Sequence, residues 1–277
     1  LTIAIWLVLM LQAEDVHHLL LNYWYFFFLG ITGAIVANST GAGGGVVFIP
    51  FFTSLGFTST ESLGTSILIQ CFGMTAGAIS WLTTSHISST KSLVLKKLLS
   101  RLLLVCGFSC IPGILIGQNV IKVDDHESMI LVFKVFSIVF GLLLLFIVLV
   151  HKGHNHTRYK IEPVDYLLLM ISSFIGALLT SWISVAIGEI VALLLILRKY
   201  PTMIAIATGV TISSISVLTA AHMHIEILDS VIWEIVIFAA PGAILGGTYA
   251  YLLSHQLGSS KLKVFFATWI LATGIAM

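Results

Sequence analysis

The sequence predicts an all-α polytopic membrane protein, built from two inverted repeats with short or broken half-helices. Three observations lead to this fold class: an apolar composition, a succession of long apolar stretches and an internal repeat. Hydrophobic residues fill 58% of the 277 positions and charged residues only 9%, whereas soluble domains carry about 25% charged residues. The formal net charge of +1 leaves no basic surface for phosphates, so nucleic acid is excluded as a partner together with the soluble enzymes.

Eight apolar stretches approach or exceed the roughly 20 residues that a membrane-spanning helix needs. They run over residues 23–40, 62–83, 98–119, 129–150, 164–187, 202–221, 231–253 and 262–277. Two shorter apolar pieces, at 45–55 and 188–197, follow glycine breaks and would reach only about half of the hydrocarbon core. Because the apolar runs are continuous rather than alternating, they predict helices and not barrel strands. The expected total is about 8–10 membrane segments.

The chain divides into four parts. Residues 1–22 form an N-terminal segment whose apolar Leu1–Leu11 run is too short to span a bilayer, so we interpret it as a partial helix or a signal remnant. A first transmembrane repeat follows at 23–150, a basic, His-rich linker at 151–163, and a second transmembrane repeat at 164–277.

Basic residues predict the orientation in the membrane. Eleven of the thirteen Lys and Arg residues lie on one set of connections, at 84–101, 151–163, 198–199 and 254–263. Since connections rich in Lys and Arg stay in the cytoplasm, these four are predicted to be cytoplasmic. The chain is thus expected to be a multi-pass protein of a plasma or inner membrane.

The internal repeat predicts a transporter. Residues recur 143 positions apart in the pairs Gly33/Gly176, Gly45/Gly188 and Thr65/Thr208, and a further block containing Pro112 and Lys134 recurs 129 positions later at Pro241 and Lys263. Corresponding loops carry opposite charge character, which predicts that the two repeats are inverted. Inverted repeats with short, glycine-interrupted segments are typical of secondary transporters, whose binding sites lie at the repeat interface near the membrane midplane.

The first glycine break is the principal candidate for substrate binding. Glycine lets the backbone approach a ligand closely, and the amides at the start of a half-helix favour anions. The predicted binding residues here are Asn38, Ser39, Thr40, Gly41, Gly43, Gly44 and Gly45. Close helix packing through small residues is the alternative interpretation, but four glycines within five residues exceed what packing requires.

The helix after each break adds polar groups to the candidate site. Thr65, Ser66 and Gln70 follow the first break, and Thr208 and Ser213 follow the second. The alternative is that these hydroxyls bond back to carbonyls of their own helix, which is common in membranes.

Glu189 follows the second break directly after Gly188, inside an apolar run. An ionisable side chain is costly within a membrane and is a functional candidate by default, so we predict that Glu189 carries a coupling proton. The alternative is a neutral carboxylic acid that acts as a structural hydrogen-bond donor.

No catalytic residue, metal site or cofactor is predicted, and the protein is not expected to be an enzyme. The three cysteines are interpreted as small buried hydrophobic residues, and the linker histidines as solvated. An intramembrane enzyme or metal-handling protein that pairs Glu189 with His222 or His224 is a competing hypothesis. These interpretations concern Cys71, Cys106, Cys110, His151, His154 and His156.

The segment Gly41-Ala42-Gly43-Gly44-Gly45 with Pro50, followed by Glu61-Ser62-Leu63-Gly64-Thr65-Ser66, resembles the sulfite exporter TauE/SafE family of membrane anion permeases. The second half departs from the family pattern, because Ala186-Ile187-Gly188-Glu189 stands where three glycines are usual. The resemblance covers about residues 24–277.

That resemblance implies export of a small sulfur-containing anion, sulfite or an organosulfonate, coupled to protons. With the repeats it predicts a secondary transporter that works by alternating access, with a small anion and the lipid bilayer as its partners. Two alternatives are a carrier of another small anion or carboxylate, and a non-transporting structural subunit of a membrane complex.

Overall fold

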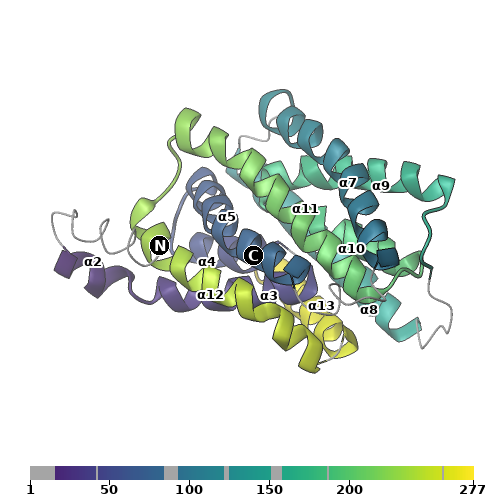
Figure 1. Ribbon diagram of the computed structural model, residues 1–277. Helices are drawn as coiled ribbons and strands as arrows, with labels where there is room; N and C mark the ends of the chain where they lie inside the picture. The colour runs from purple at the N-terminus through teal and green to yellow at the C-terminus, as the bar shows by residue number, and fades with distance from the viewer. Residues whose placement is uncertain are drawn as a thin grey trace.

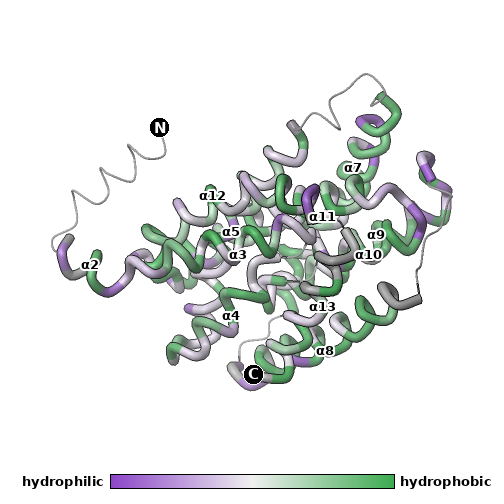
Figure 2. The backbone as a smooth tube through the Cα atoms, turned by 90° about the horizontal axis from the view of Figure 1, so that it is seen from below, coloured by the Kyte–Doolittle hydropathy of each residue, from purple (hydrophilic) through white to green (hydrophobic). Residues whose placement is uncertain are grey.

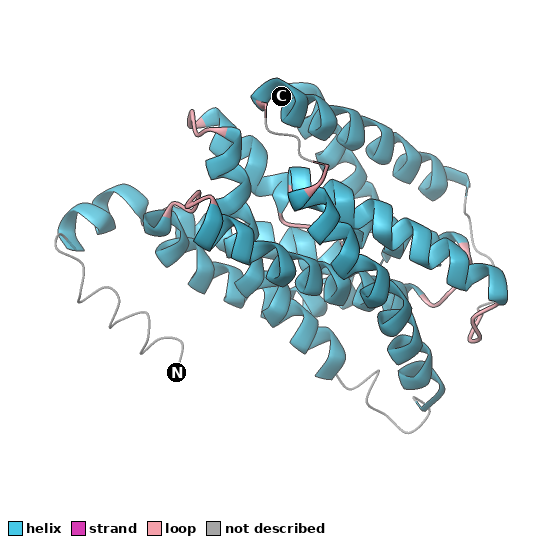
Figure 3. Ribbon diagram, turned by 90° about the horizontal axis from the view of Figure 1, so that it is seen from above, coloured by secondary structure: helices cyan, strands magenta, loops and turns pink. Residues whose placement is uncertain are grey.

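The computed structural model describes residues 16–41, 43–83, 93–121, 125–150, 158–185, 187–257 and 259–277. Within these ranges every regular element is a helix (Figure 3), so the expected all-α architecture is confirmed. The Leu1–Leu11 run and the linker histidines lie outside the described residues.

Figure 1 shows the helices with their labels, and their order along the chain is as follows. They are α2 (Val16–Tyr23), α3 (Phe26–Thr40), α4 (Gly45–Ser54), α5 (Ser59–Thr83), α7 (Leu93–Asn119), α8 (His126–Val150), α9 (Pro163–Ile183), α10 (Ile187–Leu197), α11 (Thr202–His222), the π-helical turn η2 (Met223–Ile227), α12 (Trp233–Leu257) and α13 (Ser259–Ala276).

Seven of the described helical spans are long and apolar enough to cross a membrane, while α4 and α10 are the two short apolar helices. These seven correspond to seven of the eight predicted spans, whereas α13, which covers the predicted span 262–277, is not among them. Apolar residues colour most of the outer helices in Figure 2, and large side chains such as Leu104 and Phe108 are more than 70% exposed on α7. A surface of this kind is suited to lipid rather than to water.

Helices from the two predicted repeats pack against each other across the molecule. Helix α3 lies along α12, and α9 lies along α7, while α5 and α11 cross at the centre (Figure 1). Glycines make these approaches close. A Cβ on Gly242 would collide with the carbonyl of Phe27, and one on Gly113 would come within 2.8 Å of the Phe174 carbonyl oxygen. Small residues are the usual means of tight helix packing in membranes.

Helix boundaries repeat at the spacing found in the sequence. Three of them recur 143 positions apart: the last residues of α3 and α9 (Thr40, Ile183), the last residues of α4 and α10 (Ser54, Leu197) and the first residues of α5 and α11 (Ser59, Thr202). Left-handed backbone recurs at the same spacing, at Gly41 and Ser184 and again at Gly56 and Lys199. The opposite orientation of the two halves stays a prediction.

Candidate substrate site at the two helix breaks

The first break separates α3 from α4. Helix α3 ends at Gly41, which has a φ of 86° and donates its amide to the Ala37 carbonyl. Glycine adopts this left-handed conformation without the steric cost that a side chain would add. The chain then turns so that the amides of Gly43 and Gly44, which belong to no helix, point at side chains from other elements.

The Gly43 amide donates to Oε1 of Glu189 at 3.0 Å. Glu189 lies in the first turn of α10 and is only 3% exposed. The two glycine-containing breaks, distant in sequence, are therefore joined through this carboxyl group. The hydrogen bond places the predicted proton-coupling residue against the predicted anion-binding backbone.

Gln70 holds the next amide. Its Oε1 accepts from the Gly44 amide at 2.7 Å, and its Nε2 lies 2.6 Å from the Ser184 hydroxyl and 3.0 Å from the Ser66 hydroxyl. The two serine hydroxyls are themselves 3.1 Å apart. Gln70 is 2% exposed, so this network is buried and links α5 to both breaks.

The second break separates α9 from α10. Helix α9 ends at Ser184, whose φ of 58° is left-handed. Inside the break, the Thr180 hydroxyl accepts from the Ile187 amide at 3.1 Å and lies 2.9 Å from the Val185 carbonyl oxygen. Sequence reasoning missed both Ser184 and Thr180. The repeat held a signal for Ser184, because it stands 143 positions after Gly41.

The two breaks touch at their glycines. A Cβ on Gly45 would come within 2.6 Å of the Ser184 carbonyl oxygen, and a Cβ on Gly188 would collide with the Gly41 carbonyl and the Ser213 hydroxyl. Each half-helix thus begins against the carbonyl that ends the opposite long helix. No side chain larger than hydrogen fits at either position.

Several predicted residues lie at the breaks without facing the shared space. The hydroxyls of Ser39, Thr40 and Thr208 bond to carbonyls of their own helices. Thr65 accepts from the Ile232 amide at 3.0 Å and joins α5 to the start of α12 instead. For Thr208 the contact with its own helix is the one that the back-bonding interpretation describes.

Asn38 and Ser213 each keep a buried oxygen for which the described residues provide no partner. The Asn38 side chain donates to the carbonyls of Ala34 and Gly73, and it borders a small interior space next to Gly44 and Gln70. Unpaired buried polar atoms are rare and call for a ligand, water or movement to satisfy them.

Positive charge at the breaks comes from backbone amides and not from the described side chains. The amides of Gly45 and Val46, in the first turn of α4, have no hydrogen-bond partner among the described residues, and a helix N-terminus carries partial positive charge. No Lys or Arg is among the buried described side chains. Backbone amides and hydroxyls would therefore hold the ligand. The described residues contain no group of three or more His, Cys, Asp or Glu side chains that could hold a metal.

An ionic cluster fixes the far end of α10. Asp165, near the start of α9 and 1% exposed, accepts from Nε of Arg198 at 2.5 Å and from the Tyr200 hydroxyl at 2.6 Å. The hydrogen bond to Asp165 raises the pKa of Arg198, and burial together with Asp165 raises the pKa of Tyr200. Arg198 also pairs with Glu162 at 3.1 Å, so the α10–α11 turn is held against the start of α9.

Comparisons with known proteins agree with this architecture. A family model described as "Sulfite exporter TauE/SafE" matches residues 26–277. The chain is 25% identical to the "Probable membrane transporter protein YunE" of Bacillus subtilis, over 89% of this chain and 93% of that protein. No solved structure matches.

Proposed function

Because the chain belongs to the sulfite exporter TauE/SafE family of membrane transporters, we propose that it exports a small sulfur-containing anion, sulfite or an organosulfonate, by proton-coupled alternating access. The anion would bind where the two breaks meet, in a plasma or inner membrane with the basic loops cytoplasmic. The two halves would have opposite orientations and exchange roles during the cycle.

The observation that carries the proposal is the hydrogen bond from the Gly43 amide to Glu189. A carboxylate is itself a small oxyanion, and here it occupies a backbone donor at a broken helix, the kind of donor that binds anions. An anionic substrate that needs this amide has to take the place of Glu189.

Protonation of Glu189 provides the coupling. A neutral carboxyl group is a weaker acceptor than a carboxylate, so a proton on Glu189 loosens its hold on the Gly43 amide and removes the charge that repels the substrate. Proton and anion would therefore bind together and move in the same direction. An inside-acidic gradient is then expected to accelerate anion export.

Flux in proteoliposomes tests this proposal. Sulfite, sulfate, a short sulfonate and a short carboxylate are compared with and without a pH gradient, for wild type, Glu189→Gln and Glu234→Gln. Glu234 is an exposed carboxylate at the start of α12 and serves as the matched control. We expect gradient-driven sulfite or sulfonate flux in wild type and Glu234→Gln, and flux without response to the gradient, or none, in Glu189→Gln.

Other outcomes would contradict particular parts of the proposal. Coupled flux that survives in Glu189→Gln removes Glu189 from the mechanism. If the carboxylate is transported in preference to the sulfur-containing anions, the substrate class is a carboxylate instead. If no anion moves, the structural-subunit alternative replaces the carrier.

A further inference from the structure

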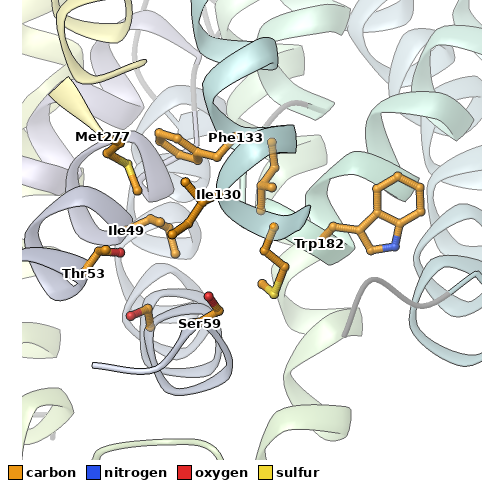
Figure 4. Close-up of a pocket in the computed structure, with 10 residues that line it drawn as sticks. Ile49, Thr53, Ser59, Ile130, Phe133, Trp182 and Met277 are labelled. Atoms are coloured by element: carbon orange, nitrogen blue, oxygen red, sulfur yellow. The ribbon is translucent and has the colours of Figure 1, made fainter. Parts of the chain in front are cut away.

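A pocket lies at the end of the bundle where α5 and α8 begin (Figure 4). Thr53 from α4 and Ser59 and Ser62 from α5 give one wall hydroxyl groups, while Phe133 from α8 and Trp182 from α9 belong to the apolar wall. Helix α5 runs from this end toward residues 84–101, which are predicted to be cytoplasmic. The pocket therefore lies on the predicted outer side.

The pocket lining contains a buried serine, Ser62, whose hydroxyl group is unpaired within the described part of the chain. The residue is 1% exposed, yet its hydroxyl finds no hydrogen-bond partner among the described residues. A buried hydroxyl normally has a partner, because leaving it unpaired costs free energy. Its position in the pocket lining indicates that the missing partner is a ligand or its water.

A polar stripe connects the pocket to the helix breaks. Ser59, Ser62, Ser66 and Gln70 are spaced by three or four residues along α5, which places them on one helix face. Ser66 and Gln70, the inner members, belong to the network that contacts both breaks. The stripe gives an ion successive polar partners from the pocket to the Gly44 amide.

The two helix ends at the pocket favour anions, while Glu61, Asp125 and Glu127 place carboxylates at the same helix ends. Ser62 and Met129 lie in the first turns of α5 and α8, so two helix N-termini border the same space. The described residues that line the pocket include no Asp or Glu. The nearby Glu61 carboxylate is bound to the Thr58 hydroxyl at 2.7 Å and caps α5.

We propose that this pocket is the outer vestibule of the anion pathway, and that Ser62 passes the anion to Ser66 and Gln70. This inference rests on the proposed transport function. The stripe is interrupted in the second half, since the positions 143 later than Ser62 and Ser66 hold Ala205 and Gly209.

Removing the unpaired hydroxyl tests the vestibule in transport. Ser62→Ala is compared with Ser137→Ala, because Ser137 is an equally buried and unpaired serine on α8 outside the pocket lining. Neither change breaks a hydrogen bond, so both proteins are expected to melt at or above the wild-type temperature. Ser62→Ala should reduce anion flux about tenfold at low anion concentration, as expected for a lost bond to a charged group. Equal flux in the two variants would overturn the proposal.

Chemical accessibility tests the vestibule without transport. Ser62→Cys is placed in a background in which the buried Cys71, Cys106 and Cys110 are alanine, in right-side-out membrane vesicles. We expect external 2-sulfonatoethyl methanethiosulfonate, itself an organosulfonate, to label position 62 at least tenfold faster than the cationic trimethylammonium-ethyl reagent. No labelling, faster labelling by the cation, or labelling only from the inside overturns the vestibule. If the wild-type protein moves no anion but position 62 still reacts faster with the anionic reagent, only the transport proposal is refuted.

Discussion

The backbone amide of Gly43 and the carboxyl group of Glu189, 146 positions apart in the chain, are hydrogen-bonded at 3.0 Å. The contact joins the first break to the second and seats an acidic oxygen on a donor suited to a substrate anion. In this arrangement the protein supplies its own anion-like ligand. In the proposed mechanism, the Glu189 carboxyl group and the substrate anion would occupy this amide in turn.

Gln70→Leu should weaken both the fold and the site. It leaves the Gly44 amide without its partner and removes one of the two partners of the Ser184 hydroxyl, and an unsatisfied buried group costs about 1–3 kcal/mol. We expect a loss of about 2 kcal/mol in unfolding free energy and reduced anion affinity. Gln118→Leu is the control, since Gln118 donates to the Ala220 carbonyl away from the breaks. Denaturant unfolding and flux against anion concentration measure the two effects, and normal affinity in Gln70→Leu would contradict the site.

Gly188→Ala should be strongly destabilising. The added methyl group would collide with the Gly41 carbonyl, and a backbone atom of the opposite break cannot move aside as a flexible side chain can. We expect a loss of at least about 2 kcal/mol, within the range for overpacked sites, together with loss of flux. Gly107→Ala in α7 meets no atom within 4 Å and should be neutral or stabilising by up to about 1 kcal/mol. Similar melting curves for the two variants would show that the breaks do not touch.

The two left-handed turns should respond in opposite directions. Gly56 has a φ of 83° and open space around it, so Gly56→Ala should cost about 1 kcal/mol through backbone strain alone. Lys199 occupies the corresponding position with a φ of 65°, and Lys199→Gly should therefore gain about 1 kcal/mol. Thermal unfolding measures the change in stability of each variant relative to wild type. If both substitutions changed the stability in the same direction, the two positions would not share a left-handed conformation.

Tyr200→Phe should alter stability in a pH-dependent way. At pH 8 the variant loses the hydrogen bond to Asp165 and about 1–3 kcal/mol. The pKa of Tyr200 is raised in the folded protein, above an unfolded value of about 10. Between these pKa values the folded state retains a proton that the unfolded state has lost, so the Tyr200 contribution falls as pH rises. The stability gap between wild type and variant should shrink above about pH 10. A gap that widens there would contradict the assigned contact.

Much of the fold could be predicted because lipid imposes simple rules. Apolar stretch lengths located the spanning helices, and the glycine breaks located α4 and α10 within a few residues. Helix starts were less accurate: α7 begins at Leu93 rather than near residue 98, because residues such as Lys96 and Lys97 can extend a helix beyond its apolar part without breaking it. Hydropathy measures the transfer of side chains into lipid, and a helix can continue beyond the edge of its lipid-embedded part.

The site was harder to predict because side-chain direction depends on helix rotation. Sequence marked Glu189, Gln70 and the glycines, yet it could not tell that the hydroxyl of Thr208 bonds to the Ile204 carbonyl of its own helix. Ser184 escaped notice because a serine is an unusual residue for a left-handed helix end. Only the packed structure shows that this serine meets Gln70.

Glycines let α3 approach α12 and α7 approach α9 closely, and we call these two contacts the glycine seams. Each seam joins a helix of the first repeat to a helix of the second with almost no space between the backbones. Sliding one repeat past the other would separate both seams at once. In the proposed alternating-access cycle, each moving unit would therefore combine helices of both predicted repeats, α3 with α12 in one and α7 with α9 in the other. The boundary between the moving units would then differ from the boundary between the predicted repeats.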